Sequence, residues 1–298
     1  MVPVFRFAPS PNGQLHLGHA LSALINFESA RKTGGRFLLR IEDIDQSRAR
    51  AHLIEQILDD LAWLGLKWET PVLKQSTRFD QYIAAITKLS ELNLTYKAHK
   101  TRKQISRFVS EYENKNNRLW PRDPDGAPFY PRYEDEPDTA SFSIRLDMAQ
   151  ALNNTPDLGW YETGSGPDSQ SGEIIAQPHL WSDVVIGRKD CATSYHLSVV
   201  LDDALQGITN IVRGADLFWS TSVHRLLQHL LNLPEPTYHH HRLITDTSGY
   251  KLSKSLLSKS ISNLRKEGCS PDDIRDMCGF CDHDLVLVSQ RPAQTAKS

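Results

Sequence analysis

The chain has 298 residues, and its 34 lysines and arginines nearly balance its 36 aspartates and glutamates. This balance excludes a protein that attracts nucleic acid through a strong overall positive charge, so any contact with RNA must come from a local basic patch. The four scattered cysteines exclude a disulfide-rich secreted scaffold, and no apolar run is long enough to cross a membrane; together these features predict a soluble protein of a reducing compartment.

The first predicted elements are a strand, a tight turn and a helix. The apolar run 2–7 predicts the strand, proline, asparagine and glycine predict a turn at 9–13, and apolar spacing predicts a helix from His16 onward. The start of a helix offers free backbone N–H groups and the positive end of the helix dipole to a phosphate. His16 and His19 lie on one side of the first turn and can both donate to phosphate oxygens, while Gly18 leaves bare backbone for an adenine or a ribose. A proline-rich turn before an ordinary helix explains the same spacing, and the spacing alone leaves both interpretations open.

Strands and helices continue to alternate after this helix. The apolar run 36–41 predicts a buried strand, which ends in the acidic cluster 42–45 at the edge where open parallel sheets bind ligands. Helices are predicted over about 46–63 and from 75 to 92. This alternation favours an α/β fold with a parallel sheet.

The pattern changes between about residues 95 and 179. Proline, glycine, aspartate and serine dominate 121–137 and 155–170, and only 140–146 alternates like a strand. We interpret this region as a domain inserted between two halves of the sheet. Its start, 96–105, concentrates basic side chains that either follow an RNA backbone or belong to the solvated start of a helix.

The sheet is predicted to resume after the insertion. A strand at 183–187 is followed by a helix over 195–203 and by a buried strand over 207–216 that ends in polar residues. Polar groups therefore emerge again at the carboxyl end of a strand, as they do at 42–45.

Two short runs resemble metal-binding patterns. Three histidines occupy 239–241, but they lie in a predicted strand, where neighbouring side chains face opposite sides and cannot meet at one ion. Cys278 and Cys281 form a single pair without the second pair that a metal site needs, and we interpret them as structural or incidental.

Two motifs far apart in the chain resemble the signature motifs of class I aminoacyl-tRNA synthetases. The first is Pro-Ser-Pro-Asn-Gly-x-x-His-Leu-Gly-His at 9–19, and the second is Lys-Leu-Ser-Lys-Ser at 251–255. The runs 42–45 and 75–78 also resemble their counterparts in glutamyl-tRNA synthetases. The resemblance implies an α/β fold, with a Rossmann-like catalytic domain, an inserted α/β domain and a short C-terminal helical segment. It divides the chain into the first half of the catalytic domain (1–94), an insertion similar to an acceptor-binding domain (95–180), the second half (181–245), and the Lys-Leu-Ser-Lys-Ser loop with a helical region (246–298).

The resemblance implies that the protein activates glutamate with ATP. The glutamate carboxylate attacks the α-phosphate and pyrophosphate leaves, so the enzyme has to align two anions and neutralise charge at phosphorus. Catalytic positions of the family correspond to His16, His19 and Lys254. Its ATP-binding positions correspond to His16, Gly18, His19, Lys251, Ser253, Lys254 and Ser255. Mg²⁺ is expected to accompany ATP, and no resident metal site is implied; a solvated polar loop is the simpler interpretation of 251–255.

The family's glutamate-binding positions correspond to Arg6, Ala8, Ser10, Glu42, Tyr195 and Arg213. Glutamate carries one ammonium and two carboxylates, which need an acidic partner and at least two cationic or hydroxyl partners. Glu42 can hold the ammonium, and Arg6 and Arg213 can each fork onto a carboxylate. The simpler interpretations are a surface carboxylate for Glu42 and a structural ion pair with Asp216 for Arg213.

The length of the part after the second motif indicates which group of the family the chain resembles. Only about forty residues follow Ser255, too few for the helical anticodon-binding region of glutamyl-tRNA synthetases. The chain therefore resembles their truncated paralogues, the glutamyl-Q tRNA(Asp) synthetases, which esterify glutamate to queuosine at the wobble position of tRNA(Asp). We expect a cytoplasmic monomer that uses L-glutamate, ATP and queuosine-containing tRNA(Asp) and makes no membrane contact.

The insertion departs from the family pattern in one respect. Family members often hold zinc there with cysteines, and the corresponding positions in this chain are Ala98, Lys100 and Glu134. Without thiolates, and with His99 isolated, we expect no structural zinc, so the insertion must be held together by packing.

Three other functions are compatible with parts of the pattern. A truncated glutamyl-tRNA synthetase would charge the terminal adenosine of tRNA. A non-catalytic RNA- or nucleotide-binding protein derived from a synthetase would not exchange pyrophosphate. A nucleotidyltransferase acting on a small metabolite would share the His-x-Gly-His chemistry but would not need Glu42 together with Arg6 and Arg213.

Overall fold

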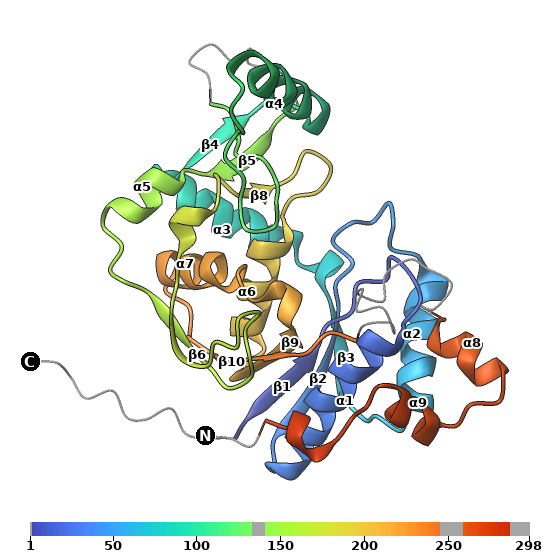
Figure 1. Cartoon of the computed structure of the whole chain (residues 1–298). Helices are drawn as coiled ribbons and strands as arrows, with labels where there is room; N and C mark the ends of the chain where they lie inside the picture. The colour runs from blue at the N-terminus through green and yellow to red at the C-terminus, as the bar shows by residue number, and fades with distance from the viewer. Residues whose placement is uncertain (1, 133–140, 245–258, 287–298) are drawn as a thin grey trace, which may run out of the picture.

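The computed structural model describes residues 2–132, 141–244 and 259–286, whose arrangement is shown in Figure 1. A seven-stranded sheet with the order β3-β2-β1-β9-β10-β6-β7 forms its centre. All neighbouring strands in it are parallel except β6 and β7. Its strands are β1 (Val4–Phe7), β2 (Arg36–Ile41), β3 (Glu69–Lys74), β6 (Gly159–Glu162), β7 (Gly172–Ile175), β9 (Asn210–Gly214) and β10 (Thr237–His241).

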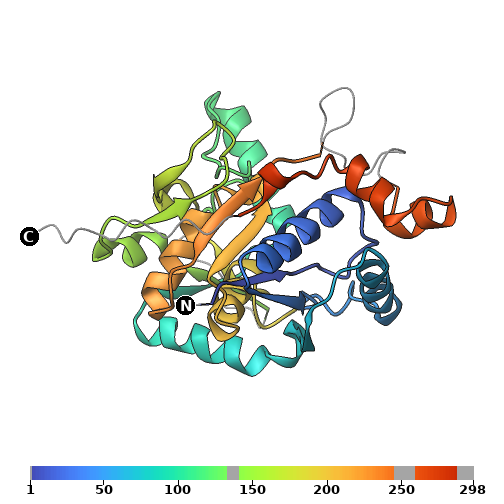
Figure 2. The same cartoon turned by 90° about the horizontal axis from the view of Figure 1, so that it is seen from below.

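Helices cover both faces of this sheet, with α1 on one face and α3 and α6 on the other (Figure 2). The helices of the described chain are α1 (Leu17–Lys32), α2 (Ala51–Trp63), α3 (Phe79–Glu91), α4 (Arg102–Asn116), α5 (Met148–Asn153), α6 (Tyr195–Leu205), α7 (Thr221–Leu231), α8 (Ile261–Lys266) and α9 (Pro271–Met277). None of the helices in the described ranges has the length and apolarity to cross a bilayer.

The alternation of side chains along β1 and β2 explains how the sheet serves both a core and a site. Phe5, Phe7 and Leu39 are buried in the cluster that contains the apolar residues of α1. Arg6 and Arg40, at the intervening positions, point to the other face and are also buried. The face of the sheet under α1 is therefore apolar. On the opposite face, which α6 covers, β1 and β2 each carry one buried arginine.

A second, antiparallel sheet contains β4 (Thr95–Ala98), β5 (Ser143–Leu146) and β8 (Val185–Gly187) in the order β4-β5-β8. The prediction that the large sheet resumes at 183–187 is therefore wrong, because β8 pairs with β5. Conversely, β6 and β7 lie within the predicted insertion but join the large sheet beside β10. The fold class is confirmed, whereas the division at 95 and 180 stays a prediction.

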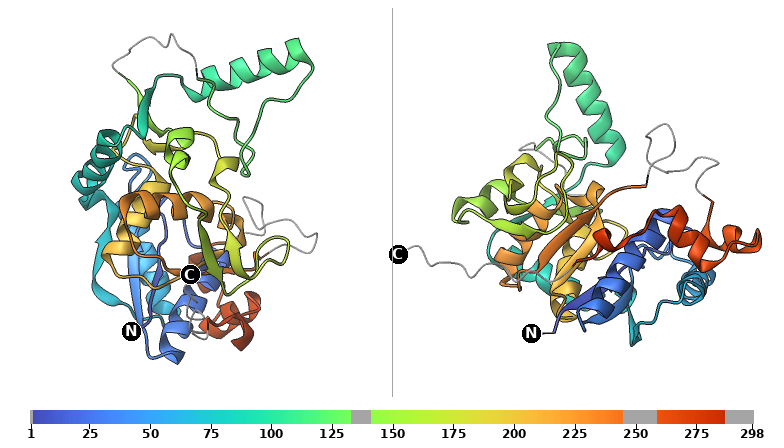
Figure 3. Two further views of the ribbon diagram at one scale, coloured as in Figure 1. Left: turned by 90° about the vertical axis from the view of Figure 1, so that its left-hand side faces the viewer. Right: turned by 60° about the horizontal axis from the view of Figure 1, so that its bottom comes forward.

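The helix α4 projects from the small sheet, away from the rest of the molecule (Figure 3). Thr101 caps it: the Thr101 hydroxyl accepts a hydrogen bond from the backbone N–H of Gln104. In return, the side chain of Gln104 accepts one from the backbone N–H of Thr101. The basic stretch 96–105 thus includes a helix start, as one of the two interpretations predicted. A small apolar cluster of Ala98, Ile105, Val109 and Tyr130 joins α4 to the sheet.

The helix predicted from about 46 begins instead at Ala51. Asp45 ends the preceding segment in a turn: its backbone carbonyl accepts from the N–H of Arg48, and its carboxylate accepts from the hydroxyl of Ser47. Side-chain competition of this kind favours a turn over helix continuation.

The C-terminal helices α8 and α9 pack beside α1 and α2 (Figure 1). Ile261 and Ile274 are buried in the same cluster as the apolar residues of α1. The backbone N–H of Ile261 donates to the carbonyl of Leu15 over 2.8 Å. The predicted C-terminal helical segment therefore stabilises the first signature motif.

Candidate active site

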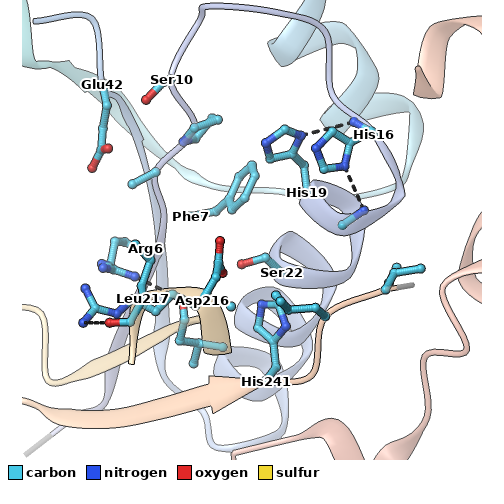
Figure 4. A pocket seen from close by; sticks show the side chains of 18 of the residues that line it. Arg6, Phe7, Ser10, His16, His19, Ser22, Glu42, Asp216, Leu217 and His241 are labelled. Atoms are coloured by element: carbon cyan, nitrogen blue, oxygen red, sulfur yellow. Dashed lines mark hydrogen bonds between the residues drawn. The ribbon is translucent and has the colours of Figure 1, made fainter. Parts of the chain in front are cut away.

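A cavity of about 480 Å³ opens at the carboxyl ends of β1, β9 and β10 and the start of α1. Nine residues predicted from the sequence line it: Arg6, Ala8, Ser10, His16, Gly18, His19, Glu42, Tyr195 and Arg213. Figure 4 shows Ser10 and Glu42 at one end of it, and His16 and His19 at another. The predicted ATP-binding residues Lys251, Ser253, Lys254 and Ser255 lie outside the described residues, as does Glu134.

The two histidines at the start of α1 have their ring orientations set by the backbone. Nδ1 of His16 accepts a hydrogen bond from the backbone N–H of Gly18 (3.1 Å), and Nδ1 of His19 accepts one from the backbone N–H of His16 (3.2 Å). Each neutral ring therefore carries its proton on Nε2, which makes that atom a donor. A Cβ at Gly18 would lie 3.0 Å from the His16 ring, a tight contact that would press on this ring, so glycine favours the arrangement.

The residues on both sides of 245–258 lie at this cavity. Ile244 lines it, and Ser260 forms an isolated β-bridge with His16. The described residues on either side of the second signature motif therefore lie at or beside the cavity.

A buried charge cluster lies beneath the Glu42 end. Asp203 of α6 accepts from Nε of Arg6 (3.0 Å) and from Nη1 of Arg40 (2.7 Å), while Nη2 of Arg40 lies 3.2 Å from Glu42. Burial alone would raise the pKa of Asp203, but Arg6 and Arg40 outweigh it and hold that pKa below its usual range. For Glu42, burial outweighs the two arginines and raises the pKa. Arg6 also donates to the carbonyl of Val212 (3.2 Å), so most of its predicted fork is already occupied.

Arg213 is held on all sides rather than paired with Asp216, so the alternative of an ion pair between them is wrong. Its hydrogen bonds run from Nε to Nε2 of His240 (3.0 Å), from Nη1 to Nδ1 of His224 (3.0 Å), and from Nη2 to the carbonyl of Leu217 (3.1 Å) and to Oγ1 of Thr221 (2.6 Å). A guanidinium has five N–H groups. Within the described chain, Arg213 can thus give a substrate carboxylate one hydrogen bond from Nη1, not the predicted fork.

The histidines around Arg213 are neutral at pH 7. Burial, with a smaller effect of Arg213, lowers the pKa of His196 to about 4 and that of His224 well below its usual value. Burial likewise lowers the pKa of His240 to about 4, although its hydrogen bond to Glu162 opposes this. Neutral rings can accept hydrogen bonds from the guanidinium, which charged rings could not.

The histidine run 239–241 separates as the strand alternation predicts. His239 contacts Oγ1 of Thr163 (3.0 Å), His240 contacts Glu162 (2.6 Å), and Nδ1 of His241 lies 2.8 Å from the carbonyl of Arg242. Across the described ranges, no group of three or more histidine, cysteine or acidic side chains is arranged to hold a metal ion.

Several residues of the site were missed by sequence reasoning. Ser22, Asp216 and His241 also line the cavity, and Asp203 and Glu162 support its arginines. Asp203 could have been noticed as an acidic residue on an otherwise apolar predicted helix. Glu162 gave no signal, because it lies in the irregular stretch between the predicted elements.

A second, larger cleft of about 1020 Å³ lies between the small sheet, α4 and the start of α6. Tyr195 lines both cavities and so marks where they meet. Basic residues outnumber acidic ones in this cleft. The basic ones are Arg48, Lys100, Arg102, Arg122, Arg145, Arg188 and Lys189, and the acidic ones are Glu113, Asp123, Asp125, Asp183 and Asp190. The combined surface leads from a basic cleft into the candidate active site.

The positions compared with zinc ligands are filled by packing. Ala98 is fully buried, and Nζ of Lys100 lies 5.6 Å from the centre of the Tyr130 ring. A methyl group and an ammonium do not ligate zinc, so these residues do not fit such a site. The expected absence of structural zinc stays a prediction.

The two cysteines of the pair lie in different environments. Cys278 is buried and donates to the carbonyl of Leu17 (3.3 Å), and burial raises the pKa of its thiol to about 12. Cys281 is exposed, and both are free thiols. The contact with Leu17 gives Cys278 a structural role beside the start of α1.

Comparison with known proteins places these features in a family. Residues 3–280 match the family of tRNA synthetases class I (E and Q), catalytic domain. The chain is 43% identical over 288 residues to a Rhodobacter capsulatus protein named glutamyl-Q tRNA(Asp) synthetase, covering 93% of this chain and 100% of that protein. A protein of the same name from Symbiobacterium thermophilum is 35% identical over 287 residues, covering 90% of this chain and 83% of that one.

Among solved structures, the glutamate-tRNA synthetase of Elizabethkingia anophelis resembles this fold with a TM-score of 0.75 at 23% identity. The similarity covers 94% of this chain but 61% of that chain, so the present sequence spans less than two thirds of it.

Proposed function

The chain belongs to the family of class I tRNA synthetases for glutamate and glutamine, in its glutamyl-Q tRNA(Asp) synthetase group, and we propose on this premise that it activates glutamate with ATP and esterifies it to the queuosine of tRNA(Asp). The observation that carries the proposal is the meeting of nine predicted residues at one cavity. A second support is the 43% identity to the full length of a protein of that name.

Glutamate occupies the end of the cavity near Glu42 in this proposal. Glu42 takes the substrate ammonium, whose positive charge favours the ionised carboxylate that burial disfavours. Nη1 of Arg213 donates one hydrogen bond to a substrate carboxylate, and Arg6 adds positive charge below it. Ser10 and Tyr195 contribute hydroxyl groups, and the small side chain of Ala8 leaves room for the substrate.

ATP lies with its phosphates at the start of α1. The Nε2–H groups of His16 and His19 and the helix dipole stabilise charge that develops at the α-phosphorus. Backbone at Gly18 lies against the nucleoside. Lys254 neutralises the departing phosphates, and Lys251, Ser253 and Ser255 also bind ATP, with Mg²⁺ arriving as its counter-ion. The described residues that flank 245–258 lie at or beside the cavity, which supports this assignment.

Two bond exchanges complete the reaction. A glutamate carboxylate oxygen bonds to the α-phosphorus as the bond to the pyrophosphate oxygen breaks. A hydroxyl oxygen of the queuosine cyclopentenediol then bonds to the carbonyl carbon of the adenylate, and AMP and a proton are released. Both attacks use an oxygen nucleophile, so alignment rather than covalent catalysis is the main task of the site.

The basic cleft accommodates the RNA. Its lysine and arginine side chains neutralise phosphates, and its junction with the active site at Tyr195 allows one nucleoside to reach the glutamate. In this proposal the protein is a cytoplasmic monomer that acts where ATP and tRNA occur.

The test is transfer of labelled glutamate, in the presence of ATP, to three tRNA(Asp) preparations. One contains queuosine, one lacks it, and one contains queuosine but lacks the terminal adenosine. Transfer to the first and third alone is the expected result. Transfer that requires the terminal adenosine would identify a truncated glutamyl-tRNA synthetase, and loss of both transfer and glutamate-dependent pyrophosphate exchange would identify a non-catalytic protein.

A further inference from the structure

We propose that Glu162 is a positioning residue, which fixes the tautomer of His240 and thereby orients Arg213 for the substrate carboxylate. The inference rests on the proposed role of Arg213 in binding glutamate. It concerns three side chains on three neighbouring strands, Glu162 on β6, His240 on β10 and Arg213 on β9. All three side chains are buried, and the three residues are far apart in the sequence.

The carboxylate of Glu162 is surrounded by donors. Oε1 accepts from the backbone N–H groups of Gly164 and His240, both at 2.8 Å. Oε2 lies 2.6 Å from Nδ1 of His240 and 3.3 Å from Nε1 of Trp160. Burial alone would raise the pKa of Glu162, but the hydrogen bonds from His240 and Gly164 hold it below its usual range. The carboxylate is therefore ionised and accepts the Nδ1 proton of His240.

The tautomer has a direct consequence for Arg213. With its proton on Nδ1, the neutral ring of His240 presents a lone pair on Nε2, which accepts from Nε of Arg213 over 3.0 Å. The opposite tautomer would place an N–H group against the N–H of Arg213. Since His224 accepts from Nη1 on the other side, the guanidinium is fixed between two ring lone pairs.

A purely structural link between β6 and β10 would explain the same short contact. The two roles differ in what they predict for substrate binding. A structural link affects the free energy of unfolding and leaves the KM for glutamate unchanged, whereas a positioning role changes the KM for glutamate and leaves the KM for ATP unchanged.

The variant Glu162→Gln separates these roles because it preserves shape and removes the charge. The backbone N–H groups of Gly164 and His240 cannot change direction and lie closer to the carboxylate (2.8 Å) than Nε1 of Trp160 (3.3 Å), so we expect the amide oxygen to face them. Its NH₂ group then faces Nδ1 of His240 and forces the ring proton onto Nε2, against Arg213. We expect the KM for glutamate in pyrophosphate exchange to rise about tenfold or more, the change for loss of one hydrogen bond to a charged group.

A second substitution tests the mechanism by rescue. In the double variant Glu162→Gln with His240→Gln, the side-chain amide at 240 can rotate its oxygen toward Arg213 whatever occupies position 162. We expect its KM for glutamate to return to within about threefold of the wild-type value. The matched control is His239→Gln, the adjacent histidine of β10, which contacts Thr163 and does not line the cavity; it should leave both KM values unchanged.

The wild-type protein gives an independent readout if a variant fails to fold. In the ¹⁵N spectrum of the histidine-labelled protein, His240 should be neutral with a protonated Nδ1 and an unprotonated Nε2. A proton on Nε2, or an unchanged KM for glutamate in folded Glu162→Gln, would overturn the inference. Absence of glutamate-dependent pyrophosphate exchange in the wild-type protein would instead overturn the proposed function, and the tautomer would still be measurable.

Discussion

Nε of Arg6 lies 3.0 Å from Oδ1 of Asp203, although 197 residues separate the two side chains in the sequence. Arg40 reaches the same carboxylate, so one buried acid contacts two buried cations of neighbouring strands. The contact joins the first strand of the sheet to α6 and fixes the floor of the candidate active site.

Asp203→Asn should therefore destabilise the protein and abolish glutamate activation. Removing one member of a buried ionic cluster leaves the others uncompensated, which costs about 3–5 kcal/mol. Urea unfolding should show this loss above pH 5, whereas Glu111→Gln, at an exposed pair with Arg107, should change stability very little. Because the pKa of Asp203 is lowered in the folded state, its stabilisation is present above the pKa of an unfolded aspartate and disappears as the pH falls through the folded value. Equal stability of Asp203→Asn and the wild type at pH 7 would contradict the argument.

Asp60 of α2 should behave in the opposite way. Both its carboxylate oxygens are buried without a hydrogen-bond partner in the described chain, and burial, aided by Asp59, raises its pKa to about 6. The folded state therefore binds the proton more tightly, and stability falls as the pH rises from about 4 to about 6. Asp60→Asn should raise the Tm at pH 8 and leave it unchanged at pH 4. A lower Tm at pH 8 would show that the charged form is stabilised instead.

His16 has two roles that substitution can separate, because it caps α1 and presents Nε2–H to the cavity. His16→Asn keeps a good capping group but removes that donor, whereas His16→Ala removes both. We expect kcat for pyrophosphate exchange to fall about 100-fold or more in both variants. The free energy of unfolding should fall by about 1 kcal/mol in His16→Ala only. Wild-type kcat in His16→Asn would exclude the donor role.

The insertion should be stable without metal. The Trp120 ring packs on Phe108 and Tyr112, with ring centres 5.1 and 4.8 Å away, and its Nε1 donates to the carbonyl of Phe129. A strong chelator should leave the Tm unchanged, while Trp120→Ala should cost roughly 2 kcal/mol, less than for a fully buried tryptophan. Leu119→Ala, at an exposed neighbouring position, is the control. A chelator-dependent fall in Tm would reveal a metal that the described residues do not explain.

The parts of the site that were predictable from sequence are those formed by neighbouring residues. His16, Gly18 and His19 share one helical turn, and Glu42 directly follows its strand, so local patterns were sufficient to place them. The strand β3 was missed because it contains Pro71 and has too few apolar residues to show a strand pattern.

The supporting contacts could not be predicted because their partners are distant in the chain. Glu162 and His240 are 78 residues apart, and β6 joins the large sheet only through β10. The same distance explains why sequence patterns did not show that the forks expected at Arg6 and Arg213 are mostly occupied. Most of their side-chain partners come from α6, α7 and β10, which no local pattern relates to β1 or β9.

The role of the basic cleft in binding RNA can be tested on one helix. Arg102 begins α4 and lines the cleft, whereas Arg107 lies on the same helix, pairs with Glu111 and does not line it. Arg102→Ala should raise the KM for tRNA several-fold and reduce the slope of log affinity against log salt by about 1, the change for one lost phosphate contact. Pyrophosphate exchange without tRNA should be unchanged, because Arg102 does not line the catalytic cavity. Arg107→Ala should match the wild type in all three measurements. Equal effects of the two substitutions on tRNA binding would mean that the overall charge of α4, and not the cleft, attracts the RNA.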